Sequence, residues 1–166
     1  MRVCILILLL FSITVTACDQ RPNQTAREDK STGVTLSAND EISYIVLFEL
    51  LSRFDATKDP NKVAFVSVEK SDPTPQLLEK LRTRWPDLRP TTDSYLDEVG
   101  ASVKDRLTNK DGVRYEIFEI RRIDENTVEV GGGYYSSNLG ASGCDYKVHH
   151  ETSNWIVAGK GDCWIS

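Results

Sequence analysis

The chain contains few of the residues from which metal and redox centres are built. Among its 166 residues are two histidines, His149 and His150, and four cysteines without any Cys-x-x-Cys spacing. Adjacent strand residues point to opposite faces, so the two histidines do not bind one metal ion together. We therefore predict no metal site and no cofactor. We interpret His150 as lying at the edge of the core and His149 as facing solvent.

Clusters of lysine and arginine are also missing from the sequence. The formal net charge is −5, with 25 acidic and 20 basic residues, and the basic residues are scattered along the chain. Proteins that bind nucleic acids or anionic membrane surfaces carry a concentrated basic patch. The composition therefore argues against nucleic acid as a partner and against electrostatic attachment to a membrane.

Motifs of nucleotide-binding proteins and serine hydrolases do not occur either. The glycines 131–133 lead into Tyr134-Tyr135 and more strand pattern, whereas phosphate-binding glycines lead into a helix N-terminus. We interpret these glycines as a bulge, a sharp bend or room for a neighbouring ring. There is no Gly-x-Ser-x-Gly sequence, and acidic pairs such as Glu116 and Glu119 are interpreted as a solvated face. No catalytic residue is predicted.

Only one long hydrophobic run is present, and it lies at the N-terminus. From Val3 to Val15 the residues are almost all apolar, and Arg2 precedes them. This length is typical of the core of a signal peptide, because a helix that spans a bilayer needs roughly 20 apolar residues. We therefore exclude residues 1–17 from the folded domain.

The run ends in Val15-Thr16-Ala17-Cys18, which resembles the lipobox of bacterial lipoproteins. The resemblance implies that residues 1–17 are a signal peptide, that the Cys18 sulfur carries a diacylglycerol, and that its new amino group is acylated. Two or three acyl chains give a stable anchor, so we expect attachment to a membrane of the cell envelope, with the protein facing the periplasm or exterior. The alternative is an ordinary secretory signal, with Cys18 as an incidental thiol.

Residues 18–38 are rich in polar and charged side chains. Such a segment buries too little apolar surface to offset its ordering entropy. We predict a flexible tether over residues 18–38 and a single folded domain over residues 39–166.

The pattern of the domain changes from helical to extended along the chain. Apolar residues recur at near-helical spacing from Ile42 to Phe54, after an expected N-cap at Asn39. Lys62–Glu69 reads as a strand. Thr74 and Pro75 start a second expected helix, which Pro86 stops.

Residues 87–98 show no clear pattern, and a period of two follows. The expected hairpin turn at 109–112 carries an Asp-Gly pair, and a change of phase after Ile117 indicates a β-bulge. The expected strands are 101–107, 113–120, 127–135, 145–150, 154–158 and a short last one at 164–165. The sequence therefore predicts an α+β fold, with two N-terminal helices packed on a curved, mostly antiparallel sheet of about five to six strands.

Two cysteines remain in the domain, Cys144 and Cys163, because Cys4 is lost with the signal peptide. If the last hairpin turns at Thr152-Ser153, Cys144 lies opposite Gly161 and close to Cys163. An exported location permits disulfides, so we predict a bond between Cys144 and Cys163.

Aromatic residues are concentrated in the C-terminal sheet. Tyrosine and tryptophan are favoured anchors at binding surfaces, and we name Tyr134, Tyr135 and Trp155 as a candidate ligand or partner patch. The alternative is that these side chains belong to the core.

The segments around AFVSVEKSDPTPQLLEKL and VEVGGGYYSSNLGASGCDYKV, followed by NWIV and WIS, resemble small uncharacterised exported proteins of bacteria. The resemblance covers much of residues 63–166 and implies one domain without an assigned activity. We predict a non-enzymatic envelope lipoprotein that binds a protein or a small ligand. The alternative is a small envelope enzyme with a pocket between the helices and a curved sheet.

Overall fold

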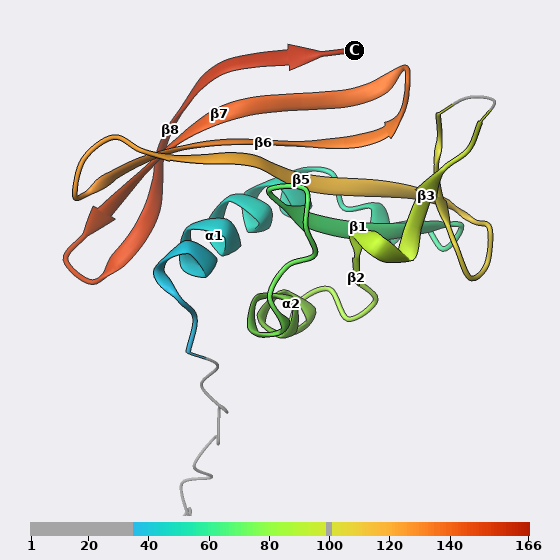
Figure 1. Cartoon of the computed structure of the whole chain (residues 1–166), viewed down its shortest axis with the longest axis horizontal. Coiled ribbons are helices and arrows are strands. Elements are labelled where there is room, and N and C mark those ends of the chain that lie inside the picture. Colours follow the sequence, from blue (N-terminus) through green and yellow to red (C-terminus); the bar gives the residue numbers. More distant parts are fainter. Residues whose placement is uncertain (1–34, 99–100) are drawn as a thin grey trace, which may run out of the picture. The chain divides into compact units, whose positions relative to one another are not determined.

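The computed structural model describes residues 35–98 and 101–166, which form two helices and an eight-stranded mixed sheet (Figure 1). The helices are α1 (Ala38–Arg53) and α2 (Pro75–Arg82). The strands are β1 (Lys62–Val68), β2 (Arg89–Pro90), β3 (Ser94–Leu96), β4 (Val103–Asp105), β5 (Asp111–Arg122), β6 (Thr127–Ser137), β7 (Gly140–Glu151) and β8 (Asn154–Ile165). The predicted signal peptide, Cys18 and nearly all of the predicted tether lie outside the described residues.

The predicted α+β class is confirmed, but the arrangement differs in two respects. The sheet has eight strands rather than five to six, and two of them, β2 and β3, lie in the segment where we saw no pattern. Strands of two or three residues are too short to show an alternation. The helices also lie mid-chain rather than at the N-terminus, at Ala38–Arg53 and Pro75–Arg82, and the strand predicted between them is present as β1.

The sheet has the order β2-β1-β5-β6-β7-β8. β1 is parallel to both of its neighbours, and β5 to β8 form an antiparallel meander. β3 and β4 form an antiparallel pair that joins β5 through Lys104 and Asp111. The predicted β-bulge after Ile117 is confirmed by a register shift between Ile117 and Glu119.

Both helices begin at a capping side chain. Ser37 Oγ accepts a hydrogen bond of 3.2 Å from Asp40 N–H, so the cap of α1 lies two residues before the predicted Asn39. The second start is as predicted: Thr74 Oγ1 accepts from Leu77 N–H at 3.2 Å, and Pro75 is the first helical residue.

The predicted turn at 109–112 is wrong in position. Asp111 and Gly112 already belong to β5, where they pair with Lys62 and Val63 of β1. Within residues 109–112, Asn109 is the residue with a positive φ, at 59°. Gly112 is required by close packing, because a Cβ there would lie 2.6 Å from the Phe65 ring. Similarly, residues 164–165 are not a separate strand but the end of β8.

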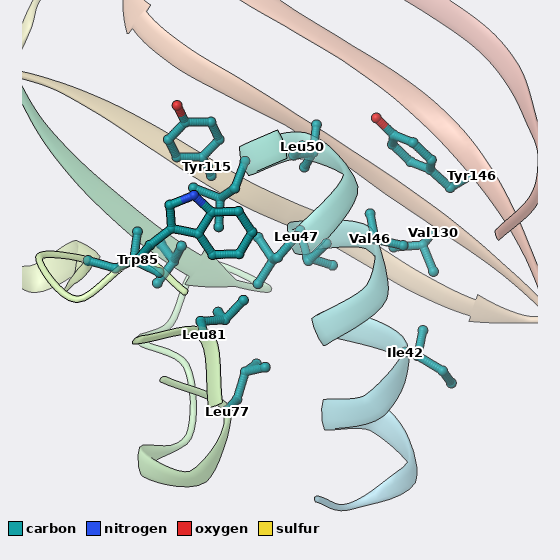
Figure 2. Packing of buried hydrophobic residues seen from close by; sticks show 14 of the residues in the cluster. Ile42, Val46, Leu47, Leu50, Leu77, Leu81, Trp85, Tyr115, Val130 and Tyr146 are labelled. Atoms are coloured by element: carbon teal, nitrogen blue, oxygen red, sulfur yellow. The ribbon is translucent and has the colours of Figure 1, made fainter. Parts of the chain in front are cut away.

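The main core lies between the helices and one face of the sheet. In Figure 2, Val46 of α1 lies beside Val130 of the sheet, while Leu47 points toward Leu81 of α2. Helix α1 contacts β5, β6 and β8, and α2 packs against α1. The fully buried members include Ile42, Val46, Leu47, Leu51, Leu77, Leu81, Tyr115, Ile117, Val128, Val130 and Val148.

A second, smaller buried region lies on the other face of the sheet, under the β3–β4 pair. Phe65 alternates with Ala64 and Val66 of β1 and therefore points away from the helices. It is fully buried, and so is Val103 of β4. The β3–β4 pair thus covers the outer face at β1 and at the start of β5.

Tyr115 links β5 to the segment after α1. Its hydroxyl donates to the Phe54 carbonyl oxygen and accepts from Ala56 N–H at 3.0 Å. Burial raises the pKa of Tyr115 to about 12. The folded state therefore favours the neutral phenol more than the unfolded state does, whose tyrosines titrate near pH ~10.

We predict that Tyr115→Phe lowers the free energy of unfolding at pH 7 by about 1–3 kcal/mol, because Phe54 and Ala56 each lose a partner. The contribution from the raised pKa is complete below pH ~10 and is lost as the pH rises toward 12. Urea unfolding at several pH values between 8 and 12 measures both effects. Tyr95→Phe is the matched control, since that hydroxyl bonds Asn109 at the surface. Equal alkaline losses in wild type and Tyr115→Phe would contradict the assignment.

Candidate functional site

The predicted disulfide is confirmed, with Cys144 and Cys163 directly opposite each other on β7 and β8. The hairpin closes at Glu151 and Asn154, so regular pairing would place Gly161 opposite Cys144. Two register shifts along the ladder bring Cys163 there instead. The bond closes a loop with a sequence separation of 19 and stabilises the domain by about 3 kcal/mol in the chain-entropy model.

The three aromatic residues of the candidate patch lie in separate places. Tyr134 packs on Phe54, with ring centroids 4.6 Å apart. Tyr135 is its neighbour in β6 and points to the opposite face, where its hydroxyl donates to the Ala101 carbonyl oxygen at 2.8 Å. Trp155 lies at the start of β8. A binding role for any one of them stays a prediction.

The histidines lie on opposite faces of β7. The His150 ring packs against Trp155 at 4.9 Å between centroids, and His149 Nδ1 lies 3.3 Å from Thr127 Oγ1. Over residues 35–98 and 101–166, no group of three or more histidine, cysteine, aspartate or glutamate residues is placed to hold a metal ion.

A cavity of about 420 Å³ lies beside the start of β1, and its charged groups mostly bind one another or the backbone. Arg89 Nη1 lies 2.7 Å from Asp105 Oδ1, Arg82 Nε donates to the Leu88 carbonyl oxygen, and Lys110 Nζ donates to the Pro60 carbonyl oxygen. We assign these groups to holding the loops around β1 together.

In another cavity, of about 350 Å³, the ends of two arginine side chains are not bound by other groups of the described residues. This cavity opens on the outer face of the sheet, beside the β3–β4 pair, and we call it the basic pocket. Its hydroxyl groups come from Ser67, Thr91, Thr92 and Ser94. Its charged groups are Lys70, Arg106, Arg114 and Glu116.

Arg114 is held in the basic pocket through one nitrogen. Its Nε donates to Ser94 Oγ at 2.7 Å, and Ser94 Oγ in turn donates to the Thr91 carbonyl oxygen at 2.6 Å. Burial lowers the pKa of the Arg114 guanidinium, Glu116 raises it, and the like charge of Arg106 lowers it further. Two cationic groups are therefore close enough to repel each other.

Arg106 is held in the same manner. Its Nε donates to the Thr92 carbonyl oxygen at 2.9 Å, and its guanidinium lies over the Tyr95 ring. The carboxylate of Asp72 fixes Thr92, accepting from its backbone N–H at 2.9 Å and from its hydroxyl at 2.6 Å. Within the described part of the chain, the terminal nitrogens of Arg106 and Arg114 make no hydrogen bond, so both guanidinium ends are open to a ligand.

Ser67 adds a hydroxyl group to the lining of the basic pocket. The residue is only 2% exposed and points to the outer face of β1, like Phe65. Its hydroxyl makes no hydrogen bond among residues 35–98 and 101–166, and no buried side-chain oxygen in those residues lacks a partner, so the hydroxyl oxygen reaches the surface of the pocket. The hydroxyl is therefore available to a bound molecule.

Sequence reasoning missed this pocket because its charges are far apart in the chain. Lys70 follows β1, Arg106 follows β4 and Arg114 lies within β5. A search for basic clusters along the sequence does not detect such a set. The one local signal is Arg114 itself, a charged residue in the strand pattern between Val113 and Tyr115.

No protein-family model, no curated protein and no solved structure matches the chain. Neither α1 nor α2 is long and apolar enough to cross a membrane, a finding that applies to the described residues.

Proposed function

We propose that the protein is a lipoprotein of the cell envelope, anchored to a membrane through lipid on Cys18, and that its α+β domain is a non-enzymatic binding module. Support for the anchor comes from the sequence Val15-Thr16-Ala17-Cys18 at the end of an apolar run. The polar residues 18–38 provide the length of chain between lipid and domain.

The observation that carries the binding role is the arrangement of Arg106 and Arg114. Each guanidinium is fixed at Nε by an oxygen of the protein, and its terminal nitrogens are left for a ligand. Groups held in place before binding lose less entropy when the ligand arrives, which favours affinity. The basic pocket is therefore the binding site that we propose.

The enzyme alternative requires a pocket between the helices and the sheet. The described residues at that interface form a buried cluster in which Val46, Leu50 and Tyr146 participate. A cavity of about 360 Å³ opens beside it, lined by residues of α1, α2 and β8 that include Trp155. No particular observation favours a reaction there, and we do not propose one.

We predict that Cys18→Ala moves the protein from the membrane fraction to the soluble fraction, because the substitution removes the sulfur that accepts lipid. The measurement is immunoblotting of membranes washed with carbonate, together with incorporation of labelled palmitate. Cys4→Ala is the matched control, since that cysteine lies in the predicted signal peptide and should leave both readouts unchanged. A Cys18→Ala protein that stays in washed membranes would contradict the proposed lipid anchor.

A further inference from the structure

We propose that the basic pocket binds a phosphate group, carried either by a small soluble ester or by the headgroup of a membrane lipid. This inference rests on the proposed binding role and names its ligand class. The phosphate would lie between the guanidinium ends of Arg106 and Arg114, with Lys70 and the Ser67 hydroxyl as further donors.

The charge of the basic pocket selects an anion. Lys70, Arg106 and Arg114 are cationic, and Glu116 is the single carboxylate among the lining residues. No ion pair joins Glu116 to a cation within the described residues, so its carboxylate does not occupy the guanidinium ends. An anion of two negative charges would match the remaining positive charge and relieve the repulsion between Arg106 and Arg114.

The donor geometry favours phosphate over a carboxylate. Each guanidinium presents a planar pair of terminal N–H groups, which bind two oxygens of one anion at once. Two such pairs, together with an ammonium group and a hydroxyl, offer more donors than the two oxygens of a carboxylate use. A tetrahedral anion with three or more free oxygens satisfies them from several directions.

The volume leaves room for more than the phosphate itself. About 350 Å³ is at the lower end of the range for small-molecule sites, roughly 300–1,000 Å³. The hydroxyls of Thr91 and Thr92 line the remaining space, which suits the polar part of a phosphate ester. A glycerol phosphate monoester has this chemistry, and it occurs both free, as glycerol 3-phosphate, and within a lipid, as the headgroup of phosphatidic acid.

The test is calorimetric titration of the full chain in a non-ionic detergent, with inorganic phosphate and glycerol 3-phosphate as probes and acetate at equal ionic strength as a control. We expect binding of both phosphates and little binding of acetate. Phosphatidic acid in mixed micelles, compared with diacylglycerol, distinguishes the sources. Tighter binding of phosphatidic acid than of glycerol 3-phosphate indicates a lipid headgroup, and tighter binding of glycerol 3-phosphate indicates a soluble ester.

Variants assign the binding to the basic pocket. Lys70→Gln and Arg106→Gln should each weaken the affinity about tenfold, because each removes a charged donor. Glu116→Gln should strengthen it by about threefold, because it removes the opposing charge. Lys58→Gln, at an exposed lysine outside the pocket, is the matched control. Lys70→Gln and Glu116→Gln carry the test if Arg106→Gln fails to fold.

The inference is overturned if no phosphate compound binds, if acetate binds equally well, or if the three pocket variants bind like wild type. The phosphate proposal can fail while the proposed lipid anchor on Cys18 holds. Loss of phosphate binding leaves the membrane fractionation of Cys18→Ala unaffected, and the reverse also holds.

Discussion

Asp105→Ala is expected to lower the free energy of unfolding by about 3 kcal/mol, because it removes a buried carboxylate from four donors. Asp105 is fully buried. It accepts hydrogen bonds from Leu107 N–H, from the backbone N–H and hydroxyl of Thr108, and from Arg89 Nη1 at 2.7 Å. Arg89 keeps a second partner in Asp93, so the cost comes mainly from the backbone groups that would be left unpaired.

Asp111→Ala is the matched control. The distance from Lys104 Nζ to Asp111 Oδ1 is also 2.7 Å, but the Asp111 side chain is 62% exposed. An exposed ion pair of this kind contributes about 0–1 kcal/mol. Urea unfolding of both variants measures the difference, and equal losses would contradict the role that we assign to burial.

The Asp105 carboxylate also makes the free energy of unfolding depend on pH in the acid range. Burial raises the pKa of Asp105, but bonds from Thr108 and Leu107 and the charge of Arg89 outweigh it, so the pKa is lowered overall. The stabilisation is therefore complete above the unfolded value near pH ~3.9 and is lost as the pH falls through the folded pKa. In Asp105→Asn, the free energy of unfolding should therefore fall less steeply as the pH is lowered. Because Asp105 precedes Arg106, this network also fixes one wall of the basic pocket.

Gly133→Ala is expected to destabilise the domain by about 3 kcal/mol or more, because the new methyl group has no space. A Cβ at Gly133 would lie 2.2 Å from the Ser142 carbonyl oxygen and 2.7 Å from the Gly143 Cα. Both atoms belong to the backbone of β7, so a side-chain rotation does not relieve the contact. The ladder between β6 and β7 would have to open at this point.

Gly131→Ala is the matched control, on the same strand and the same face. A Cβ at Gly131 would meet Asp145 Oδ1 at 3.6 Å, an ordinary contact, and a Cβ at Gly159 of β8 would meet nothing within 4 Å. These two variants should change stability little or raise it slightly, by about 0.4–1 kcal/mol. Thermal unfolding of the three variants gives the ranking. A Gly133→Ala protein as stable as Gly131→Ala would show that the strands do not approach so closely.

The sequence was most informative where a repeated pattern or a capping residue acts locally. The cap of α2 at Thr74 and the β-bulge after Ile117 were both predicted and are both observed, because each depends on neighbouring residues. The disulfide was also predictable, since a hairpin brings distant residues of one ribbon together. Its register was not, because the two shifts beyond the turn at Glu151 and Asn154 leave no clear trace in the residue pattern.

What the sequence did not reveal depends on contacts between distant segments. The Asp-Gly pair at 111–112 suggested a turn, but packing of Gly112 against Phe65 places it in a strand. Likewise, Arg106 and Arg114 come together only because β3 and β4 fold over the outer face of the sheet. Ser94 joins them through Arg114 Nε, although it lies in the segment that showed no pattern.

The register shifts that place Cys163 opposite Cys144 have a further consequence for association between molecules. In the described strand order, β8 is one end of the sheet, and β2, with only Arg89 and Pro90, is the other. Bulges and proline interrupt the regular row of backbone groups with which a foreign strand would pair. Both ends of the sheet are thus poor templates for strand addition, which disfavours fibril-like growth where many copies are concentrated.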